Sequence, residues 1–400
     1  MFITPSGNRL HIGIFGRRNL GKSSLINAIT SQDLAIVSSV PGTTTDPVYK
    51  SMEILPIGPC MLIDTAGIDD DSGELGRMRI EATRKVLRKT DVAILLFGAM
   101  DGFGSYEKEM MDLFAANKIP FIACINKSDI GGTEAIEKEL NSLGLRPVKV
   151  SSITGQGIDD LKDRIIEASP SGWSPVPLVK DILKKGDIVL LVCPIDGAMP
   201  QGRLILPQVQ VLREVLDSDS IGLVVKPGEI ERSLTSLKKE PRLVITDSQV
   251  FEDVSSLIPG NVPLTSFSIV FARHKGDLDV FVSGLDAIKS LSDGDEILIS
   301  EACTHHVQPE DIGRSKIPTW LRSYTGKDLI FNVTSGGDFP SDPGRYKLVV
   351  SCGGCMVTRR EVQHRISRCM ASKVPITNYG VIIAFMTGIL DRVVEPFKVK

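Results

Sequence analysis

The sequence has little net charge and no apolar run long enough to span a bilayer. Its 46 Lys and Arg residues against 49 Asp and Glu residues leave a net charge of −3. It therefore lacks the basic excess by which proteins capture nucleic acid or anionic membranes. The most apolar late stretch, 381–390, has about half the residues that a spanning helix needs, so we expect a buried helix there. The N-terminus lacks a signal-peptide layout. We expect a cytoplasmic protein that binds neither nucleic acid nor membrane.

Cysteine is too sparse for a disulfide scaffold. Seven cysteines in a chain of 400 residues with this cytosolic appearance favour metal binding or reduced thiols over disulfides. Some of them lie in apolar strand-like runs or at an apolar position of a helical pattern, where a thiol behaves as a small core residue. We expect core packing for Cys60, Cys124, Cys193 and Cys369, and ordinary structural roles for His11, His274 and His364, which belong to no motif.

The length of 400 residues exceeds what one hydrophobic core normally serves, so two or three domains are expected. The first part alternates apolar strands with helical patterns, which is typical of a parallel α/β sheet. It ends in a helix at 157–168 and a segment rich in Pro, Ser and Gly at 169–177, which predicts a linker. The strands expected in this first domain, 1–170, are 10–15, 61–63, 92–97, 121–125 and 147–150.

Two further blocks follow the linker, and neither contains a phosphate loop. The block 178–265 predicts strands at 187–192, 221–225 and 242–246, with helical segments such as 206–216 between them. The block 266–400 predicts a strand at 268–272, a helix at 285–291, a strand at 295–300 and a last strand followed by a helix at 361–371. Both blocks therefore predict smaller α/β domains, and the middle one, without ligand motifs, suits self-association as a homodimer.

The segment GRRNLGKS follows the first apolar strand and opens a helix, which is the context that a phosphate-binding loop requires. Backbone N–H groups of such a loop cradle phosphates, Lys22 reaches the β and γ oxygens, and Ser23 ligates Mg²⁺. The pattern alone does not separate ATP from GTP. The loop residues expected to bind nucleotide are Gly16, Asn19, Gly21, Lys22, Ser23 and Ser24.

Two further motifs follow strands in the right order for a GTPase. The stretch DTAG places Asp64 at a strand end, where it can hold Mg²⁺ through water, and Gly67 where its N–H can meet the γ-phosphate. The stretch NKSD, with Asn126, Lys127 and Asp129, supplies a carboxylate that accepts both guanine N–H groups. Such paired hydrogen bonds reject a wrong base by roughly 10⁴–10⁵-fold. Ser151 and Ser152 follow the last strand, where a backbone N–H usually meets the guanine carbonyl.

Two polar stretches predict the nucleotide-sensing switches. The stretch PGTTTD at 41–46 predicts the first switch, and we favour Thr44 as the hydroxyl that completes the Mg²⁺ shell, with Thr43 and Thr45 left open. The polar stretch 68–76 predicts the second switch. Lys22, Thr44, Asp64 and Gly67 are then the expected catalytic groups. Together the motifs predict a P-loop GTPase domain with a parallel-type sheet, followed by two smaller α/β domains.

These motifs resemble the GTPases of the MnmE, Era and EngA kind over residues 8–170. The resemblance implies that Asn19 helps to bind K⁺ beside the phosphates. It also implies that Ile68 stands where Ras-like proteins carry a water-orienting glutamine. Because isoleucine cannot orient water by hydrogen bonding, we expect slow, Mg²⁺-dependent and K⁺-stimulated GTP hydrolysis, as in a timer or switch.

Cysteines in the third block form a second candidate site. Cys303-Thr-His305-His306 follows one expected strand, and Cys352-Gly-Gly-Cys355 follows another. A Cys-x-x-Cys turn lets two thiolates converge on one metal centre, and Cys303 joins them if the two strands pair in one sheet. Spacing alone leaves three readings open, namely zinc, a [4Fe–4S] cluster with one iron ligated differently, and a redox pair.

The GTPase motifs together with this cysteine spacing resemble the [FeFe]-hydrogenase maturation GTPase family, HydF, over the whole chain. The resemblance implies a [4Fe–4S] cluster on Cys303, Cys352 and Cys355. It also implies a scaffold that receives a transient diiron subcluster from radical-SAM maturases and delivers it to apo [FeFe]-hydrogenase. Many members carry a histidine where this chain has Ser351. The fourth ligand therefore stays open between His305, His306, Glu301 and an exchangeable position.

Two rival functions remain. A ribosome- or RNA-associated GTPase with a structural zinc module would share the motifs, but the basic surface that RNA binding needs is missing. A thiol oxidoreductase acting through Cys352 and Cys355 would lack a thioredoxin-like context.

Overall fold

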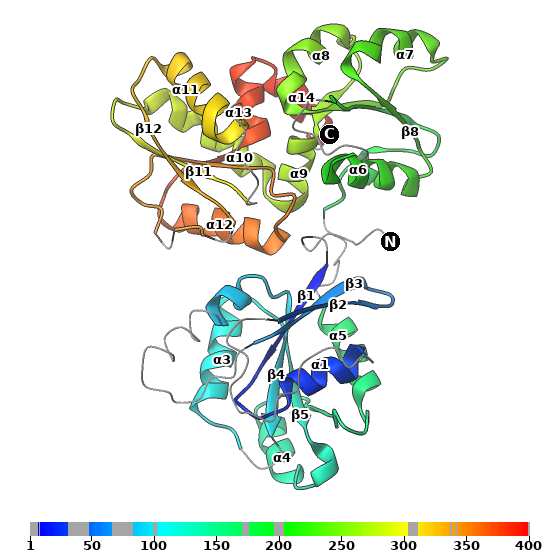
Figure 1. Cartoon of the computed structure of the whole chain (residues 1–400), viewed down its shortest axis with the longest axis vertical. Coiled ribbons are helices and arrows are strands. Elements are labelled where there is room, and N and C mark those ends of the chain that lie inside the picture. The colour runs from blue at the N-terminus through cyan, green and yellow to red at the C-terminus, as the bar shows by residue number, and fades with distance from the viewer. Residues whose placement is uncertain are drawn as a thin grey trace. The chain divides into compact units, whose positions relative to one another are not determined.

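A computed structural model describes residues 7, 9–30, 48–65, 83–98, 102–169, 176–195, 204–302, 311–336, 338–340 and 342–398. The chain divides into two compact units, 1–173 and 174–400 (Figure 1). Each unit is built from its own sheets.

The first unit contains a six-stranded sheet in the order β2-β3-β1-β4-β5-β6. Its strands are parallel except β2, which runs antiparallel to β3. The sequence did not predict β2, because most of its residues are at least partly exposed and show no apolar run. The strands are β1 (Leu10–Phe15), β2 (Val48–Ile54), β3 (Gly58–Asp64), β4 (Val92–Gly98), β5 (Phe121–Asn126) and β6 (Val148–Lys149).

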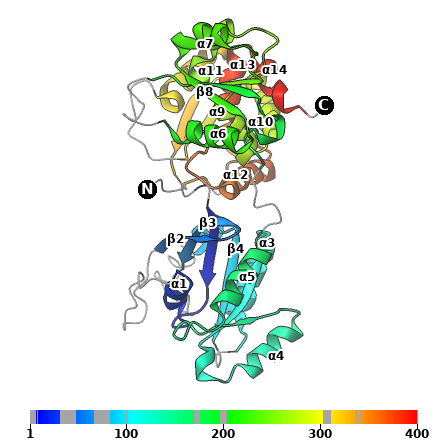
Figure 2. The same ribbon diagram turned by 90° about the vertical axis from the view of Figure 1, so that its right-hand side faces the viewer.

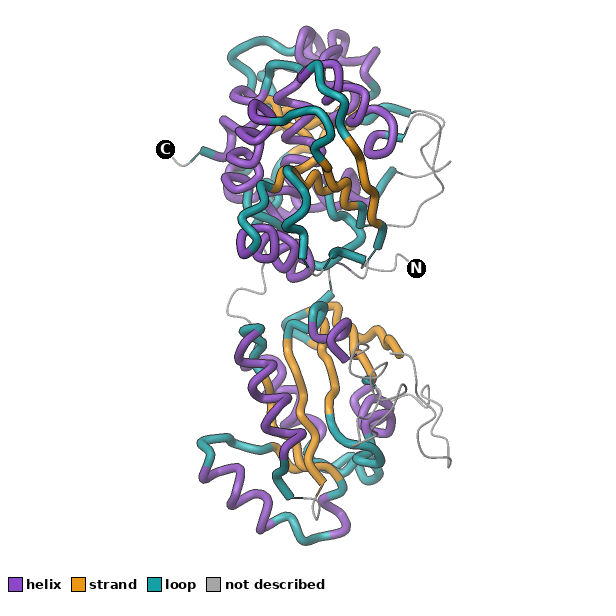
Figure 3. Tube along the Cα trace, turned by 90° about the vertical axis from the view of Figure 1, so that its left-hand side faces the viewer, coloured by secondary structure: helices purple, strands orange, loops and turns teal. Residues whose placement is uncertain are grey.

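Alternate residues of the strands pack into two cores, one on each face of this sheet. In β4, Ile94 joins the core beneath helices α1 and α5, whereas Leu95 joins the core beneath α3 and α4. Figure 3 shows the strands between these helices. Burial on both faces explains why the inner strands are continuous apolar runs. The helices are α1 (Lys22–Thr30), α3 (Ser105–Ala116), η2 (Ser128–Ile130), α4 (Glu134–Ser142) and α5 (Ile158–Ala168).

The second unit contains two parallel four-stranded sheets, in the orders β10-β9-β7-β8 and β12-β11-β13-β14. The predicted fold class, a GTPase-type α/β domain followed by further α/β domains, is confirmed. The strands are β7 (Ile188–Val192), β8 (Ile221–Val225), β9 (Leu243–Thr246), β10 (Leu264–Ser266), β11 (Glu296–Ser300), β12 (Ile330–Thr334), β13 (Leu348–Ser351) and β14 (Ile376–Asn378).

Helices connect and cover these two sheets. The longer ones are α6 (Leu206–Asp217), α9 (Phe267–Lys275), α11 (Ile317–Thr325), α12 (Arg359–Ala371) and α13 (Tyr379–Met386). The shorter ones are η3 (Lys180–Ile182), η4 (Pro227–Glu229), α7 (Ile230–Ser236), η5 (Ser248–Val250), α8 (Phe251–Leu257), α10 (Leu278–Ser283), η6 (Gly284–Ser290), η7 (Ile312–Lys316), α14 (Leu390–Val394) and η8 (Glu395–Phe397).

The expectation of a strand at 268–272 was wrong, because this segment lies within helix α9. The Ser266 hydroxyl accepts a hydrogen bond from the Ile269 backbone N–H and so caps the helix. The helix is buried on nearly all sides, so its sequence lacks the polar face by which a surface helix is recognised. The expectation of a buried helix at 381–390 is confirmed for its first part, which lies in α13; an exposed turn and the start of α14 follow. Within the described residues, no helix is long and apolar enough to cross a membrane.

The two sheets of the second unit share one topology, since each has its first strand between its second and third and its fourth strand at an edge. Helix α9 follows β10 as α13 follows β14, and the two helices pack against each other (Figure 2). Helix α10 contacts β14, and α14 contacts β10. The match extends to sequence, with identical residues at Val262 and Val374, Pro263 and Pro375, Thr265 and Thr377, Ala272 and Ala384, Gly276 and Gly388, Leu278 and Leu390, and Asp279 and Asp391.

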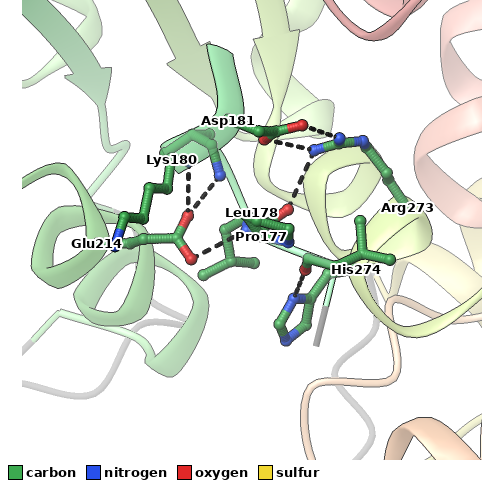
Figure 4. Close-up of polar contacts among 9 residues, drawn as sticks. Pro177, Leu178, Lys180, Asp181, Glu214, Arg273 and His274 are labelled. Atoms are coloured by element: carbon green, nitrogen blue, oxygen red, sulfur yellow. Dashed lines mark hydrogen bonds and ion pairs between the residues drawn. The ribbon is translucent and has the colours of Figure 1, made fainter. Parts of the chain in front are cut away.

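Polar side chains of α6 and α9 hold the first described residues of the second unit, 176–181 (Figure 4). The Glu214 carboxylate accepts hydrogen bonds from the backbone N–H groups of residues 178–180. The Arg273 guanidinium donates to the Pro177 carbonyl and pairs with Asp181. The neighbouring His274 ring bonds the Val176 carbonyl. The last turn of α9 therefore anchors the segment that follows the first unit.

Candidate nucleotide site and cysteine site

The loop between β1 and α1 has the backbone shape of a phosphate cradle. Asn19 and Gly21 adopt positive φ angles of 60° and 82°. A Cβ atom at Gly21 would lie 2.6 Å from Asn126 Nδ2, so glycine is required there for space as well as for conformation. Lys22 begins α1 and is buried. Its Nζ donates to the Gly16 and Arg17 carbonyls at 2.9 and 2.7 Å, which keeps the ammonium group over the loop.

Ser23 and Asp64 lie together at the start of α1 and the end of β3. Ser23 Oγ donates to Asp64 Oδ2 at 2.6 Å. The other carboxylate oxygen, Asp64 Oδ1, is buried and has no hydrogen-bond partner among the described residues. Burial raises the pKa of Asp64, against the Ser23 hydrogen bond and the nearby Lys22 charge. An orphaned buried carboxylate oxygen beside a hydroxyl fits Mg²⁺, a hard cation that prefers oxygen ligands. Thr44 and Gly67, expected at this site, lie outside the described residues.

Asn126 ties the phosphate loop to the base-recognition loops. Its Nδ2 donates to the Leu20 carbonyl at 2.8 Å, and its Oδ1 accepts from the Ser152 hydroxyl at 2.9 Å and the Ser152 backbone N–H at 3.3 Å. The Ser151 N–H donates to the Gln156 carbonyl. Both serine N–H groups are therefore engaged within the protein in this structure.

The remaining residues of the expected base site lie at the surface end of β5. Lys127 adopts a φ of 62° and turns the chain into η2. The Asp129 side chain that follows is exposed, as a carboxylate that receives a base must be. Asn19 is exposed on the phosphate loop, and Ser24 is partly buried in the first turn of α1.

The two strands that precede the cysteine motifs are neighbours in one sheet. Strand β11 pairs with β13 in parallel, with Ser300 opposite Ser351, and the Cys352 N–H donates to the Ser300 carbonyl. The two strands therefore pair in one sheet, which was the condition for the two cysteine motifs to share one edge. The Ala302 backbone N–H donates to Cys352 Sγ at 3.1 Å. Cys303, His305 and His306 lie outside the described residues.

The Cys352–Cys355 loop is lined by groups that favour negative charge on sulfur. Burial raises the pKa of both thiols. The Ala302 N–H opposes this shift at Cys352, and the Lys275 ammonium group opposes it at Cys355. Gly354 has a φ of 65°, and a Cβ at Gly353 would meet nothing within 4 Å. This donor set fits a thiolate-ligated metal, for which the thiols must lose their protons.

The described residues alone do not complete a metal site, because no group of three Cys, His, Asp or Glu residues within them could hold an ion. Glu301 lies beside the loop but is already engaged. Its two oxygens accept from Arg314, and Oε2 also accepts from Ser335. The carboxylate charge is therefore balanced by a guanidinium, and Glu301 would have to give up these hydrogen bonds to act as the fourth ligand.

Two buried cations beside the cysteine loop were not found from the sequence. Lys275 is 2% exposed and donates to the Gly354, Cys355 and Val357 carbonyls. Arg365, also 2% exposed, donates to the Ser300 hydroxyl, the Gly336 carbonyl and Glu361. The available signal was a lysine three residues after the apolar run 269–272, which no motif connects to the cysteines.

Six of the seven residues expected to have structural roles are buried, and His364 is half-buried. All four cysteines assigned to the core are buried, and burial raises the pKa of their thiols. They are Cys60, Cys124, Cys193 and Cys369. His11 and His274 are buried as well, and burial lowers the pKa of both imidazoles to about 4.

Family comparisons match three stretches of the chain. The hydrogen maturase F dimerization domain matches residues 178–276, and the hydrogen maturase F tetramerization domain matches residues 279–396. A model described as 50S ribosome-binding GTPase matches residues 11–127. The two maturase models meet between α9 and α10, so Lys275 falls in the first and the cysteine loop in the second.

Curated relatives match the GTPase part of the chain. A tRNA modification GTPase MnmE from Heliobacterium modesticaldum is 37% identical over 154 residues, which are 38% of this chain and 32% of that protein. One from Lactobacillus gasseri is 34% identical over 160 residues, 40% of this chain and 34% of that protein. The chain thus spans about a third of the length of these relatives.

Solved structures with the same kind of domain include Era from Aquifex aeolicus bound to GDP and AlF4⁻. It is 20% identical and covers 54% of this chain and 92% of its own, with a TM-score of 0.38. The G domain of the T. maritima FeoB iron transporter is 24% identical and covers 40% of this chain and 98% of its own, with a TM-score of 0.31.

Proposed function

The chain belongs to the hydrogen maturase F family, and on that premise we propose that it is a GTPase and iron–sulfur scaffold for [FeFe]-hydrogenase maturation. It would receive a diiron subcluster precursor from radical-SAM maturases and deliver it to the apo-hydrogenase. The observation that carries the proposal is the placement of Cys352 and Cys355 at the edge shared by β11 and β13, in a chain that also bears a GTPase domain.

In the first unit, GTP or GDP would bind across the phosphate loop, with guanine recognised by Asp129. Ser23 and Asp64 would hold Mg²⁺ together with Thr44, and the orphaned Asp64 oxygen supports this assignment. Lys22 would move its hydrogen bonds from loop carbonyls to phosphate oxygens, because charged acceptors bind an ammonium group more strongly than neutral ones. Asn19 would bind K⁺, and hydrolysis would be slow and stimulated by K⁺.

In the second unit, Cys303, Cys352 and Cys355 would hold a [4Fe–4S] cluster, with His305 as the candidate fourth ligand. A cluster bound by three thiolates supplies an iron with an exchangeable position, to which cargo can attach. The chain's own residues would set the charge around it: the Ala302 N–H donates to Cys352 Sγ and Lys275 lies beneath the loop. The GTP state would alter partner affinity or cargo release.

Self-association as a homodimer is part of the proposal and is supported by the family models and by β8. This strand is an edge of its sheet. It exposes Ile221 at 57% and Val224 at 37% of their surface, and an apolar open edge is a surface on which another strand can pair. The proposed domains are 1–170 for nucleotide, 178–265 for dimerisation and 266–400 for the cluster, in a cytoplasmic protein.

The test is anaerobic reconstitution of the full chain with iron and sulfide, followed by metal and sulfide analysis and EPR after dithionite reduction. We expect a reducible [4Fe–4S] signal that is lost in Cys352→Ser. The matched control is Cys369→Ser, which removes a buried thiol from α12 without touching the loop and should keep the signal. Stoichiometric zinc without iron, even after reconstitution, would refute the scaffold and leave a GTPase with a structural metal module.

A further inference from the structure

Helix α9 ends in a lysine whose charge is buried beneath the cysteine loop. Lys275 is 2% exposed. Its Nζ donates to the Val357 carbonyl at 2.8 Å, the Gly354 carbonyl at 3.0 Å and the Cys355 carbonyl at 3.2 Å. An ammonium group has three N–H donors, so these carbonyls use all of them. The side chain therefore holds three points of the segment between β13 and α12.

Hydrogen bonds to neutral carbonyls do not balance a buried charge, and an uncompensated buried ion costs several kcal/mol. Among the described residues, Lys275 forms no ion pair with a carboxylate. Burial lowers the pKa of the Lys275 ammonium group from 10.5 to about 8, and the groups that oppose this shift are Cys355, Cys352 and Glu361, in that order. Glu361 already pairs with Arg365. Within the part of the chain that the structure describes, the counter-charge left for the ammonium group is the pair of cysteine sulfurs, once a bound metal holds these as thiolates.

The repeated topology of this unit provides an internal comparison. The position equivalent to Lys275 in the second repeat is Thr387, since Gly276 and Gly388 follow them. Thr387 donates only within its own helix, to the Ile383 and Ala384 carbonyls. Helix α13 packs on η5, the turn after β9, and that turn contains no cysteine. The buried lysine thus occurs in the repeat whose helix faces the cysteine loop.

The contact is also made in the opposite direction. Gln363, on the helix that follows the cysteine loop, donates from Nε2 to the Gly276 carbonyl at 2.9 Å and the Lys275 carbonyl at 3.3 Å. These carbonyls lie at the C-terminal end of α9, where no further helical turn supplies N–H groups to donate to them. Loop and helix therefore constrain each other, and the loop's position depends on a helix from the other repeat.

We propose that Lys275 is a positioning residue of the cysteine site. It shapes the Cys352–Cys355 loop through three carbonyl hydrogen bonds and places a positive charge beside the sulfurs, which stabilises metal bound by thiolates. The inference rests on the proposed function only in taking the bound metal to be a [4Fe–4S] cluster. The contribution of the charge predicts that a cluster beside Lys275 is easier to reduce than one without it.

The experiment uses the full chain with Lys275→Met, which keeps the length of the side chain and removes its charge, and Thr387→Ala as the matched control. Anaerobic titration of the metal-free protein with Co²⁺, followed by thiolate-to-cobalt absorption, measures metal affinity. Loss of a group that orients metal ligands typically costs 10–100-fold in affinity, so we expect a loss of about 10-fold or more in Lys275→Met and none in Thr387→Ala.

The second readout is the reduction potential of the reconstituted cluster, which a purely structural role would not move at equal cluster content. We expect Lys275→Met to have the more negative potential. Lys275→Gln keeps a hydrogen-bond donor but removes the charge, so it should shift the reduction potential in the same direction. If the Met variant does not fold, the Gln variant shows whether the charge affects the potential. Unchanged cobalt affinity and potential overturn the inference. Cobalt binding that depends on Lys275 in a chain that takes up no iron supports Lys275 while refuting the scaffold.

Discussion

The phosphate loop and the cysteine loop each contain a buried lysine beneath backbone carbonyls, but the two lysines come from different places. Lys22 belongs to the loop it serves and donates to carbonyls five and six residues away. Lys275 reaches its loop from a helix 79 to 82 residues earlier in the chain. The first arrangement needs only a strand, a loop and a helix in sequence. The second needs two repeats packed correctly, so the cysteine site depends on the whole second unit.

The largest expected effect that separates the two sites is that of Lys22→Ala. Removing one charged donor from developing phosphate charge typically costs 10²–10³-fold in rate, so we expect GTP hydrolysis to fall by at least about 100-fold. Cobalt binding by the cysteine loop should not change, because the two lysines belong to separate units. Phosphate release measures GTP hydrolysis and cobalt absorption measures metal binding, both on one preparation. A loss of cobalt affinity would contradict the independence of the two sites.

Next in size is the effect of Asp129→Asn on base selection. An asparagine cannot accept both guanine N–H groups, so we expect guanine discrimination to fall by about 100-fold or more. Its amide can instead donate to a carbonyl, which predicts tighter binding of a xanthine nucleotide. Titrations with fluorescent nucleotides measure the guanine discrimination and the affinity for the xanthine nucleotide. Asp159→Asn, which changes an exposed carboxylate on α5, is the control and should keep the preference for guanine.

The buried histidines predict a smaller effect that the two units should share. Burial lowers the pKa of His11 in the first unit and of His274 in the second from 6.5 to about 4. The unfolded chain therefore binds more protons between these values, and stability falls as the pH drops through that window. We expect each unit to lose roughly 2 kcal/mol between pH 7 and about pH 4.5.

Calorimetry at the two pH values measures this loss for each unit. His11→Gln should flatten the response of the first unit only, and His274→Gln that of the second only. Equal flattening of both transitions by one substitution would show that the units do not unfold separately.

The smallest expected effect concerns the hydrogen bonds by which Glu214 holds residues 178–180 in the second unit. In Glu214→Gln the carboxylate that accepts three backbone N–H groups becomes an amide with one acceptor oxygen, at a cost of about 1 kcal/mol. Urea unfolding should show the change in the second unit alone. Asp217→Asn, which removes an exposed ion pair with Arg213 on the same helix, should be nearly neutral. An equal loss of unfolding free energy in both variants would show that the Glu214 hydrogen bonds to the backbone do not stabilise the second unit.

Contiguous patterns were the features that the sequence predicted well. The apolar runs 92–97 and 121–125 became β4 and β5 within one residue at their ends. Where burial surrounds an element on all sides, the pattern disappears, and α9 was taken for a strand. Where an edge strand is half exposed, the pattern is equally weak, and β2 was missed. Periodicity reports a difference between two faces. Helix α9 presents almost none, and in β2 the more buried face consists of Lys50, Met52 and Ile54, so a charged residue interrupts its apolar pattern.

By itself the sequence predicted the residues of the candidate nucleotide site, because each motif brings its polar groups to the end of one strand through local chain geometry. It also determined the pairing of the cysteine motifs with strand ends. Only the tertiary structure decided what surrounds the sulfurs: Lys275 and Ala302 approach from separate elements, and Arg314 pairs with Glu301. Charges that balance one another across distant segments leave no spacing to recognise, since their proximity arises only when the repeats pack.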